Sequence, residues 1–317
     1  MKKHRQAPPV SAPLDAAGLG QDDAGQSAEA WGWHSAYPAP AKLNLFLHVL
    51  GRRPDGYHEL QSAFRLLDHG DFLHFSPRQD GVICLQNPLP GVPPEADLTV
   101  RAARLLQAAS GCQQGVDIVL DKRLPMGGGL GGGSSDAATV LLALNHLWQL
   151  GLSRQTLQTL GLQLGADVPF FVFGQNAFAE GRGERLRRLD LAPSFYLVLE
   201  PPVQVPTARI FAAPELRRDR APMSYADWQP GVGENDLSRV ACAYFPEIRA
   251  HLDYLSRFGD ARMSGSGACV FVAFAHNQQP AALDALAAVR ASPDGLRGWL
   301  ARGLAQHPLA VLASNAP

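Results

Sequence analysis

A glycine-rich segment at residues 125–136, with the sequence PMGGGLGGGSSD, has the composition of an anion-binding loop. Six of the seven residues 127–133 are glycine. Because glycine has no Cβ and tolerates positive φ, the backbone N–H groups can wrap closely around a ligand. An apolar helix predicted to follow would add the unpaired N–H groups of its first turn and the positive end of its dipole. The anion that most often needs such a cradle is a nucleotide phosphate.

Three kinds of phosphate loop compete for this spacing, and two fit poorly. A Walker A loop ends in Gly-Lys-Ser/Thr, but here Gly133 is followed by Ser134 without a lysine. A dinucleotide fold with G-x-G-x-x-G needs an acidic residue roughly 20 positions later, and residues 137–166 contain no Asp or Glu. A kinase loop of the form Pro-x-x-x-Gly-Leu-Gly-Ser-Ser fits with an extra glycine or two. A flexible surface loop is disfavoured, because the segment lies between a predicted strand and a predicted helix.

Three further sets of polar residues could contact a substrate. Lys42 and Asn44 are two apart on a predicted strand, so both side chains point to one face, either into a site or toward solvent. Asp167, in the segment LGADVP, could accept a proton from an attacking hydroxyl or could cap a turn. Tyr57 and His58 can stack on a planar base and hydrogen-bond its edge, although such a pair in a hairpin is more often structural. The local sequence leaves these alternatives open.

The elements that must position these residues follow from apolar periodicity. The helix after the glycine loop is predicted over residues 137–148, with Ser134 and Ser135 as N-cap candidates. Further helices are predicted at residues 98–109, 157–164, 246–257, 281–290 and 296–304, and strands at residues 42–49, 59–67, 71–75, 116–120, 195–199 and 268–274. Helices and strands mix irregularly, which indicates an α+β fold rather than a doubly wound sheet.

Composition restricts the class of protein. With 317 residues, 46% of them apolar and 18% charged, the chain is long enough for a large core and two domains. Its net charge of −1 offers no electrostatic surface for nucleic acid or a membrane, and it has no run of 18 apolar residues. Its four cysteines lack metal-ligand spacing, which argues against a zinc site and a disulfide framework and suits a reducing cytoplasm.

The domain boundaries follow from local composition. The first 30 residues lack aromatic side chains and an apolar signal-peptide core, so residues 1–32 are interpreted as a disordered extension. Pro193 precedes the strand predicted at residues 195–199, which places a boundary near residue 190. The expected domains are therefore residues 33–190 and residues 191–317.

Five motifs occur in an order that is far more specific than any one of them alone. They are PAKLNL at residues 40–45, GRRPDGYHEL at 51–60, the glycine loop, LGADVP at 164–169 and GSGA at 265–268. Over residues 37–310 this pattern resembles the 4-diphosphocytidyl-2-C-methyl-D-erythritol kinase family of the GHMP kinase superfamily. The resemblance implies an N-terminal GHMP domain and a C-terminal ferredoxin-like domain, with the active site in the cleft between them.

The resemblance also implies a reaction. ATP, with Mg²⁺, would phosphorylate the 2-hydroxyl of the cytidylyl substrate, a step of the non-mevalonate route to isoprenoid precursors. The expected partners are the small-molecule substrate and ATP, in a cytoplasmic monomer or weak homodimer. The alternatives are another GHMP kinase, of the homoserine or mevalonate type, and a non-catalytic nucleotide-binding protein with the same fold.

Individual residues take their expected roles from the same resemblance. Asp167 matches the catalytic aspartate, a general base, and Lys42 matches the lysine that would hold this carboxylate ionised and orient the hydroxyl. The ATP-binding loop corresponds to Pro125, Met126, Gly127, Gly128, Gly129, Leu130, Gly131, Gly132, Gly133, Ser134 and Ser135. Substrate-binding positions correspond to Asn44, Tyr57 and His58, and less directly to Phe64, Thr207 and Phe211. The resemblance assigns no metal ligand.

Two residues depart from the family pattern. Asp97 stands where the family usually has Asn on the nucleotide side, and an ionised carboxylate cannot donate a hydrogen bond to adenine. Asp136 stands where the family often has Asn. An acidic residue suits the first turn of a helix, but this one would lie close to the phosphates, where an alternative role is to help hold Mg²⁺.

Overall fold

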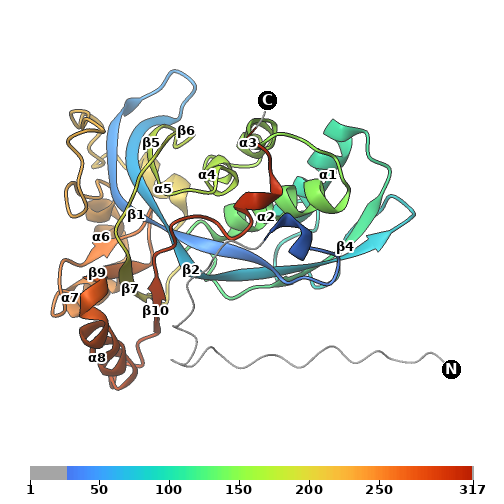
Figure 1. Ribbon diagram of the computed structural model, residues 1–317. Coiled ribbons are helices and arrows are strands. Elements are labelled where there is room, and N and C mark those ends of the chain that lie inside the picture. Colours follow the sequence, from blue (N-terminus) through green and yellow to red (C-terminus); the bar gives the residue numbers. More distant parts are fainter. Residues whose placement is uncertain (1–26, 316–317) are drawn as a thin grey trace.

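The computed structural model describes residues 27–315, and its larger sheet is built on two long strands (Figure 1). β1 (Tyr37–Arg52) pairs antiparallel with β2 (His58–Arg78), which also pairs with β4 (Gly115–Asp121) and β5 (Ala177–Gly181). β3 (Ile83–Leu85) runs parallel to β4, and β6 (Arg185–Arg188) runs antiparallel to β5. β2 is therefore the central strand of a six-stranded sheet.

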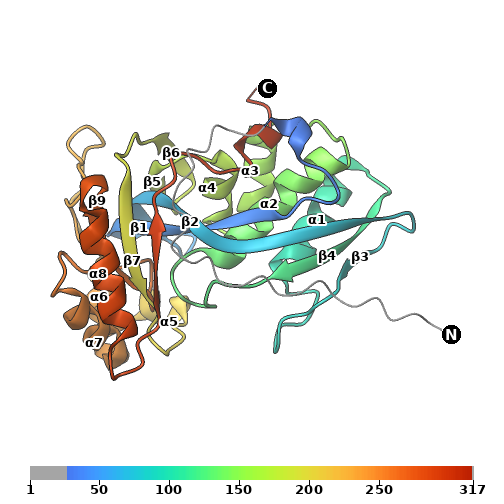
Figure 2. The same cartoon turned by 60° about the horizontal axis from the view of Figure 1, so that its bottom comes forward.

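Four helices lie together on one face of this sheet (Figures 1 and 2). They are α1 (Leu98–Ser110), α2 (Gly132–Leu147), α3 (Arg154–Leu162) and α4 (Val168–Phe173). Every residue of α2 from position 135 to position 145 is buried. A helix that is apolar nearly all round packs in a core, so α2 holds its N-terminus, and the glycine loop before it, in a fixed place.

A second sheet is antiparallel and has the strand order β10–β7–β9–β8. Its strands are β7 (Ser194–Leu199), β8 (Arg262–Met263), β9 (Val270–Ala275) and β10 (Gly298–Arg302). It lies at the end of the molecule away from α1 and β4 (Figure 1), together with α5 (Thr207–Ala212), α6 (Ser238–Tyr244), α7 (Pro246–Leu255) and α8 (Gln279–Arg290). The predicted α+β fold with two units is confirmed.

β1 and the C-terminal segment join the two units. Tyr37, at the start of β1, is buried in the core beneath α2, whereas Leu47 and Val49, near its end, are buried in the core of the second unit. After β10 the chain returns to the first unit, where Leu309 and Leu312 are buried. The chain therefore passes between the units after residue 302 as well as near residue 190.

The structure corrects two predicted elements. Residues 59–67 and 71–75 are not separate strands, because both belong to β2. Residues 296–304 are not a helix: they contain β10, which pairs along its whole length with β7. None of the helices within residues 27–315 is both long and apolar enough to cross a membrane.

The beginning of the described chain also differs from the prediction. Residues 27–32 belong to the predicted extension, but Ala28–Ala30 form a 3-10 helix. The ring of Trp31 packs on that of Tyr37 with centroids 5.2 Å apart. The ordered structure therefore begins before residue 33. The rest of the predicted extension, residues 1–26, lies outside the described residues.

Candidate active site

A cavity of about 620 Å³ lies where the two units meet. The first unit contributes residues of β1, β2, the glycine loop and the segment before α4. The second unit contributes residues of α5 and the turn before β9. The cavity therefore occupies the cleft in which the sequence placed the active site.

The glycine loop forms one wall of this cavity. All of residues 125–134 line it. Gly131 is the N-cap of α2, with φ of 72°. A Cβ at this position would lie 2.9 Å from Phe171 Cζ and 3.1 Å from Lys42 Cγ, so only glycine fits. The left-handed backbone at Gly131 turns the loop into the helix and leaves the first N–H groups of α2 at the cavity wall.

Backbone and side-chain hydrogen bonds tie the loop to β1. Lys42 N donates to Leu130 O at 2.9 Å, and Ser135 Oγ donates to Pro40 O at 2.7 Å. The prediction that Ser134 and Ser135 cap α2 is wrong, because both lie inside the helix that Gly131 begins. Ser134 lines the cavity, whereas Ser135 is fully buried beneath it.

The structure brings Lys42 and Asp167 together. Lys42 Nζ lies 3.4 Å from Asp167 Oδ2, and the two side chains are 4% and 32% exposed. Lys42 Nζ also donates to Asn44 Oδ1, and Asn44 Nδ2 donates to Ser62 Oγ at 2.8 Å. Asp167 precedes α4, but its side chain makes no capping hydrogen bond. Its carboxylate therefore faces the cavity as a possible proton acceptor rather than serving as a helix cap.

Aromatic rings cover one side of the Lys42 ammonium. Phe64 lines the cavity but is only 3% exposed. Its ring centroid lies 5.3 Å from Lys42 Nζ and 4.7 Å from the ring centroid of Phe170. A low local dielectric strengthens the attraction between Lys42 and a nearby anion.

The second unit supplies the opposite side of the site. Thr207 and Phe211, both on α5, line the cavity as does Ser266 in the turn before β9. Thr207 Oγ1 lies 2.8 Å from Ser266 Oγ. The predicted substrate positions Asn44, Phe64, Thr207 and Phe211 are thus gathered around one space.

Tyr57 and His58 lie outside the cavity lining, but each contacts a residue that belongs to it. The ring of His58 packs on that of Phe211 with centroids 4.9 Å apart, and its Nε2 accepts from Arg218 Nε at 3.1 Å. Burial and then the Arg218 charge lower the pKa of His58. Tyr57 is 54% exposed, and its ring lies 4.6 Å from Arg182 Cζ.

A buried ion-pair group beside the glycine loop was missed by sequence reasoning. Lys122 Nζ lies 2.8 Å from Asp136 Oδ2 and also donates to Asp71, whose Oδ1 accepts from the backbone N–H groups of Arg123 and Leu124 at 2.6 and 2.8 Å. Asp136 Oδ1 is buried without a hydrogen-bond partner among the described residues. Burial raises the pKa of Asp136 to about 8. Lys122 and Asp136 both line the cavity. The one sequence signal for a role of Lys122 at the phosphates was its position just before the glycine loop.

The other departure from the family pattern, Asp97, has a structural role. It is the N-cap of α1, and its Oδ1 accepts from Thr99 N at 2.8 Å. It also lines the cavity. One carboxylate oxygen is therefore used within the chain, and Asp97 holds the helix end rather than offering a donor to a base.

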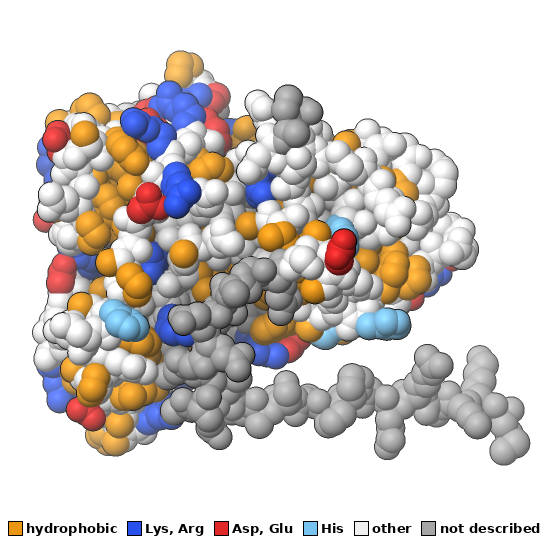
Figure 3. Space-filling model, viewed as in Figure 1, with side chains coloured by type: hydrophobic (Ala, Val, Ile, Leu, Met, Phe, Trp, Pro, Cys, Tyr) orange, Lys and Arg blue, Asp and Glu red, His pale blue; other side chains and the backbone are white. Residues whose placement is uncertain are grey.

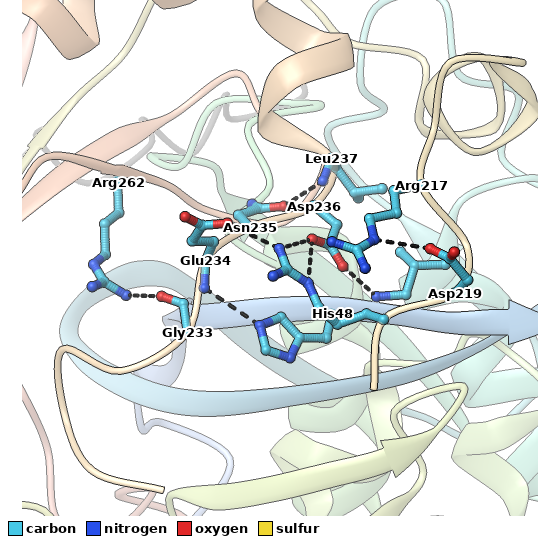
Figure 4. Close-up of polar contacts among 11 residues, drawn as sticks. His48, Arg217, Asp219, Gly233, Glu234, Asn235, Asp236, Leu237 and Arg262 are labelled. Atoms are coloured by element: carbon cyan, nitrogen blue, oxygen red, sulfur yellow. Dashed lines mark hydrogen bonds and ion pairs between the residues drawn. The ribbon is translucent and has the colours of Figure 1, made fainter. Parts of the chain in front are cut away.

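A second group that the sequence analysis missed lies between β1 and the turn before β9 (Figure 4). Asn235 Nδ2 donates to Met263 O at 2.9 Å and to Gly265 O at 2.8 Å, while its Oδ1 accepts from Leu237 N at 3.0 Å. Gly265 and Leu237 line the cavity. The available signal was an Asn-Asp pair in a glycine-rich loop, where such side chains commonly bond to nearby backbone.

The residues around Asn235 fix the same segment to β1. Asp236 Oδ2 accepts from Val49 N at 2.9 Å, and its Oδ1 accepts from Arg220 Nε at 3.0 Å. His48 Nε2 accepts from Glu234 N at 3.4 Å. Figure 4 shows His48 on β1 and Asp236 on the neighbouring segment before α6. The turn at the cavity is therefore connected to β1 through residues 234–236.

Both units of the chain match known protein families. The GHMP kinases N terminal domain matches residues 97–175, and the GHMP kinases C terminal domain matches residues 223–291. The 4-diphosphocytidyl-2-C-methyl-D-erythritol kinase of Dechloromonas aromatica (strain RCB) is 59% identical over 278 residues, which cover 87% of this chain and 100% of the relative. The chain belongs to the 4-diphosphocytidyl-2-C-methyl-D-erythritol kinase family. The kinase of the same name from Aromatoleum aromaticum (strain DSM 19018 / LMG 30748 / EbN1) is 60% identical over 272 residues, which cover 86% of this chain and 94% of the relative.

Solved structures agree with membership of this kinase family. A crystal structure of 4-(cytidine 5'-diphospho)-2C-methyl-D-erythritol kinase matches with a TM-score of 0.70 and 37% identity, over 85% of this chain and 99% of that one. The Methanococcus jannaschii mevalonate kinase matches with a TM-score of 0.61 but 15% identity, over 86% of this chain and 98% of that one. The second likeness concerns the fold alone. The family resemblance inferred from the motifs is confirmed.

Proposed function

We infer that this chain transfers the γ-phosphoryl group of ATP to the 2-hydroxyl of 4-diphosphocytidyl-2-C-methyl-D-erythritol, in the non-mevalonate route to isoprenoid precursors. Relatives that carry the name of this kinase are 59–60% identical to it. The observation that carries the proposal is the Lys42–Asp167 pair, at 3.4 Å, in the same cavity as the glycine loop. A phosphate cradle and a proton acceptor beside a cation are what phosphoryl transfer to an alcohol requires.

The proposed transfer uses these residues as follows. Backbone N–H groups of the glycine loop hold the ATP phosphates. The substrate hydroxyl oxygen forms a bond to the γ-phosphorus as the bond from that phosphorus to the leaving ADP oxygen breaks. Asp167 accepts the hydroxyl proton. Lys42 stays charged and stabilises the negative charge that develops on the oxygens, while Asn44 and Phe64 hold its ammonium in place.

Asp136 fits a role in holding Mg²⁺ with the nucleotide. Mg²⁺ is usually bound through one or two carboxylates together with substrate phosphates and water. Within residues 27–315 no three His, Cys, Asp or Glu side chains are grouped to hold a metal, but Asp136 lines the cavity and has a buried Oδ1 without a partner. The cation would supply charge neutralisation at the phosphates. Its binding would require Asp136 to release the proton that burial favours.

The base of the substrate is proposed to bind at Tyr57 and His58. Because Nε2 of His58 accepts a hydrogen bond from Arg218, a neutral ring carries its proton on Nδ1. The lowered pKa of His58 favours that neutral ring. Nδ1–H can then donate to an acceptor on the cytosine edge, and the half-exposed ring of Tyr57 offers a stacking surface.

We also propose a cytoplasmic monomer or weak homodimer. The four cysteines are free, which suits a reducing compartment. Few large apolar side chains are exposed among the described residues: Tyr57, Val82, Val119, Met126, Val232 and Val311. A permanent interface normally needs a contiguous apolar patch, so sedimentation analysis should find mainly monomer at micromolar concentration.

The proposed reaction is tested with the full chain, ATP, Mg²⁺ and three acceptors. Phosphorus NMR should reveal a new phosphomonoester and ADP with the cytidylyl substrate, and no product with homoserine or mevalonate. Turnover of homoserine or mevalonate without turnover of the cytidylyl substrate would overturn the proposal in favour of another GHMP kinase. Absence of turnover with all three would point to a non-catalytic protein.

A further inference from the structure

Three cationic side chains line the cavity, and they differ in whether a carboxylate is paired with them. Lys42 and Lys122 are both paired with carboxylates of the chain. The guanidinium of Arg182 forms no ion pair with a carboxylate among residues 27–315. Its guanidinium instead lies against the ring of Tyr57, with Cζ 4.6 Å from the centroid. Arg182 is therefore a half-buried cation in the cavity lining that forms no ion pair within the described part of the chain.

The turn between β5 and β6 places Gly183, the residue after Arg182, beside Asp167. Arg182 N donates to Glu184 Oε2 at 2.6 Å, and Gly183 N donates to Glu180 O at 3.1 Å, which fixes the turn. A Cβ on Gly183 would lie 3.9 Å from Asp167 Oδ1. The residue next to Arg182 thus borders the catalytic carboxylate, and the arginine lies on the acceptor side of the site.

Two acidic residues of the neighbouring β1–β2 segment, Asp55 and Glu59, are paired with other arginines. Figure 3 shows basic and acidic side chains mixed at the end of the molecule where β1 turns into β2. Glu59 accepts from Arg53 at 2.7 Å and from Arg185 at 2.5 Å, and Asp55 lies 3.3 Å from Arg53. The guanidinium of Arg182 therefore lies in the cavity lining without an ion-pair partner among residues 27–315.

We propose that the guanidinium of Arg182 binds the diphosphate of the cytidylyl substrate, an inference that rests on the proposed function. The diphosphate is attached to carbon 4 and the reacting hydroxyl to carbon 2, so only a few bonds separate the two groups. With the hydroxyl at Asp167, the diphosphate must lie nearby, whereas the glycine loop serves the phosphates of ATP. Arginine binds phosphate oxygens through charge-assisted hydrogen bonds, and the ring of Tyr57 holds the guanidinium in position.

The test compares binding of CDP with binding of cytidine, since the two differ only in the diphosphate. Both affinities are measured by calorimetry on the full chain, on Arg182→Gln, and on Arg185→Gln as a matched control. Arg185 carries the same charge three residues away, but it is paired with Glu59 and does not line the cavity. We expect Arg182→Gln to weaken CDP binding by about 10- to 100-fold, as loss of a charge-assisted hydrogen bond does, and to leave cytidine binding within about twofold. Arg185→Gln should change neither affinity by more than about twofold.

Each other result contradicts a stated part of the account. Unchanged CDP binding by Arg182→Gln would overturn the assignment of the diphosphate to this residue. Equal weakening of CDP and cytidine would overturn it too, because the guanidinium would then serve the base or its stacking surface. A native chain that binds neither CDP nor cytidine would overturn the proposed function itself, and this inference with it. Thermal melting of both variants checks that each is folded.

Discussion

The ammonium of Lys42, on β1, lies 3.4 Å from the carboxylate of Asp167, at the start of α4. The backbone N–H of Lys42 meanwhile donates to Leu130 in the glycine loop at 2.9 Å. One residue thus connects the phosphate cradle to the proton acceptor. Because these contacts join buried or helix-anchored segments, the loop that binds ATP and the carboxylate that faces the substrate hydroxyl keep fixed relative positions before substrate binds.

Base recognition makes a prediction about His58. Replacing His58 with Ala removes the Nδ1–H proposed to donate to cytosine and the ring that packs on Phe211. Loss of such a hydrogen bond costs roughly 1–3 kcal/mol, so KM for the cytidylyl substrate should rise by about 5- to 150-fold. KM for ATP should not change. Steady-state kinetics measure both, and a variant impaired only toward ATP would move this residue to the nucleotide side.

The buried carboxylate of Asp136 makes a prediction about pH. Its pKa is raised to about 8, mainly by burial, from an ordinary value of 3.8. Between these values the folded state holds a proton that the unfolded state has released, so the free energy of unfolding falls as pH rises from about 4 to about 8. Asp136→Asn cannot titrate and should lack this contribution, which is at most about 1.4 kcal/mol per pH unit. Urea denaturation of both proteins at pH 5 and pH 8 measures the difference. If the free energy of unfolding changed equally with pH in both proteins, Asp136 would be ionised throughout this pH range.

The contacts of Asn235 predict that it positions Gly265 at the cavity, in addition to stabilising the fold. Asn235→Asp keeps the acceptor for Leu237 N but faces the carbonyls of Met263 and Gly265 with an oxygen. The unpaired carbonyls should lower the free energy of unfolding by about 1–3 kcal/mol, and displacement of Gly265 should raise KM for the substrate several-fold. Asn145→Asp is the control, because Asn145 likewise bonds to both backbone groups of Leu152 but lies away from the cavity.

Urea denaturation and steady-state kinetics separate the two variants. Both should be destabilised, and only Asn235→Asp should show altered KM under conditions where both proteins are fully folded. Equal kinetics for the two variants would mean that Asn235 contributes to stability alone.

Residues inside the family motifs are the ones whose meeting in space the resemblance predicted, and the structure places them at one cavity. Local sequence left the roles of Lys42 and Asp167 open, and only the order of the motifs along the chain joined them to the glycine loop. Asn235 and Lys122 were missed because their partners are distant in the chain and their own neighbourhoods have no periodicity. Nothing local indicates that Lys122 meets Asp71, or that Asn235 meets Gly265.

The helix predicted at residues 296–304 and the break predicted in β2 are both wrong because contacts with distant strands decide the local structure. In residues 296–304 the apolar side chains recur at a spacing that fits a helix, but the backbone of β10 pairs with β7, far away in sequence, and this tertiary pairing overrides the local preference. The predicted break in β2 coincides with Gly70. A Cβ there would lie 2.2 Å from Ala39 O. The glycine therefore allows β1 and β2 to approach closely within one continuous strand rather than ending it.

The central claim is that Asp167 accepts the proton of the substrate hydroxyl with Lys42 beside it. The most direct measurement is the single-turnover rate of Asp167→Asn with saturating ATP and cytidylyl substrate, together with its ATP affinity. The amide keeps the shape but cannot act as the base, so the rate should fall by at least about 10²-fold with ATP affinity retained. Addition of Lys42→Met should lower the rate little further, because groups that act as a unit are not additive. A near-native rate for Asp167→Asn would contradict the account and leave catalysis to phosphate positioning alone.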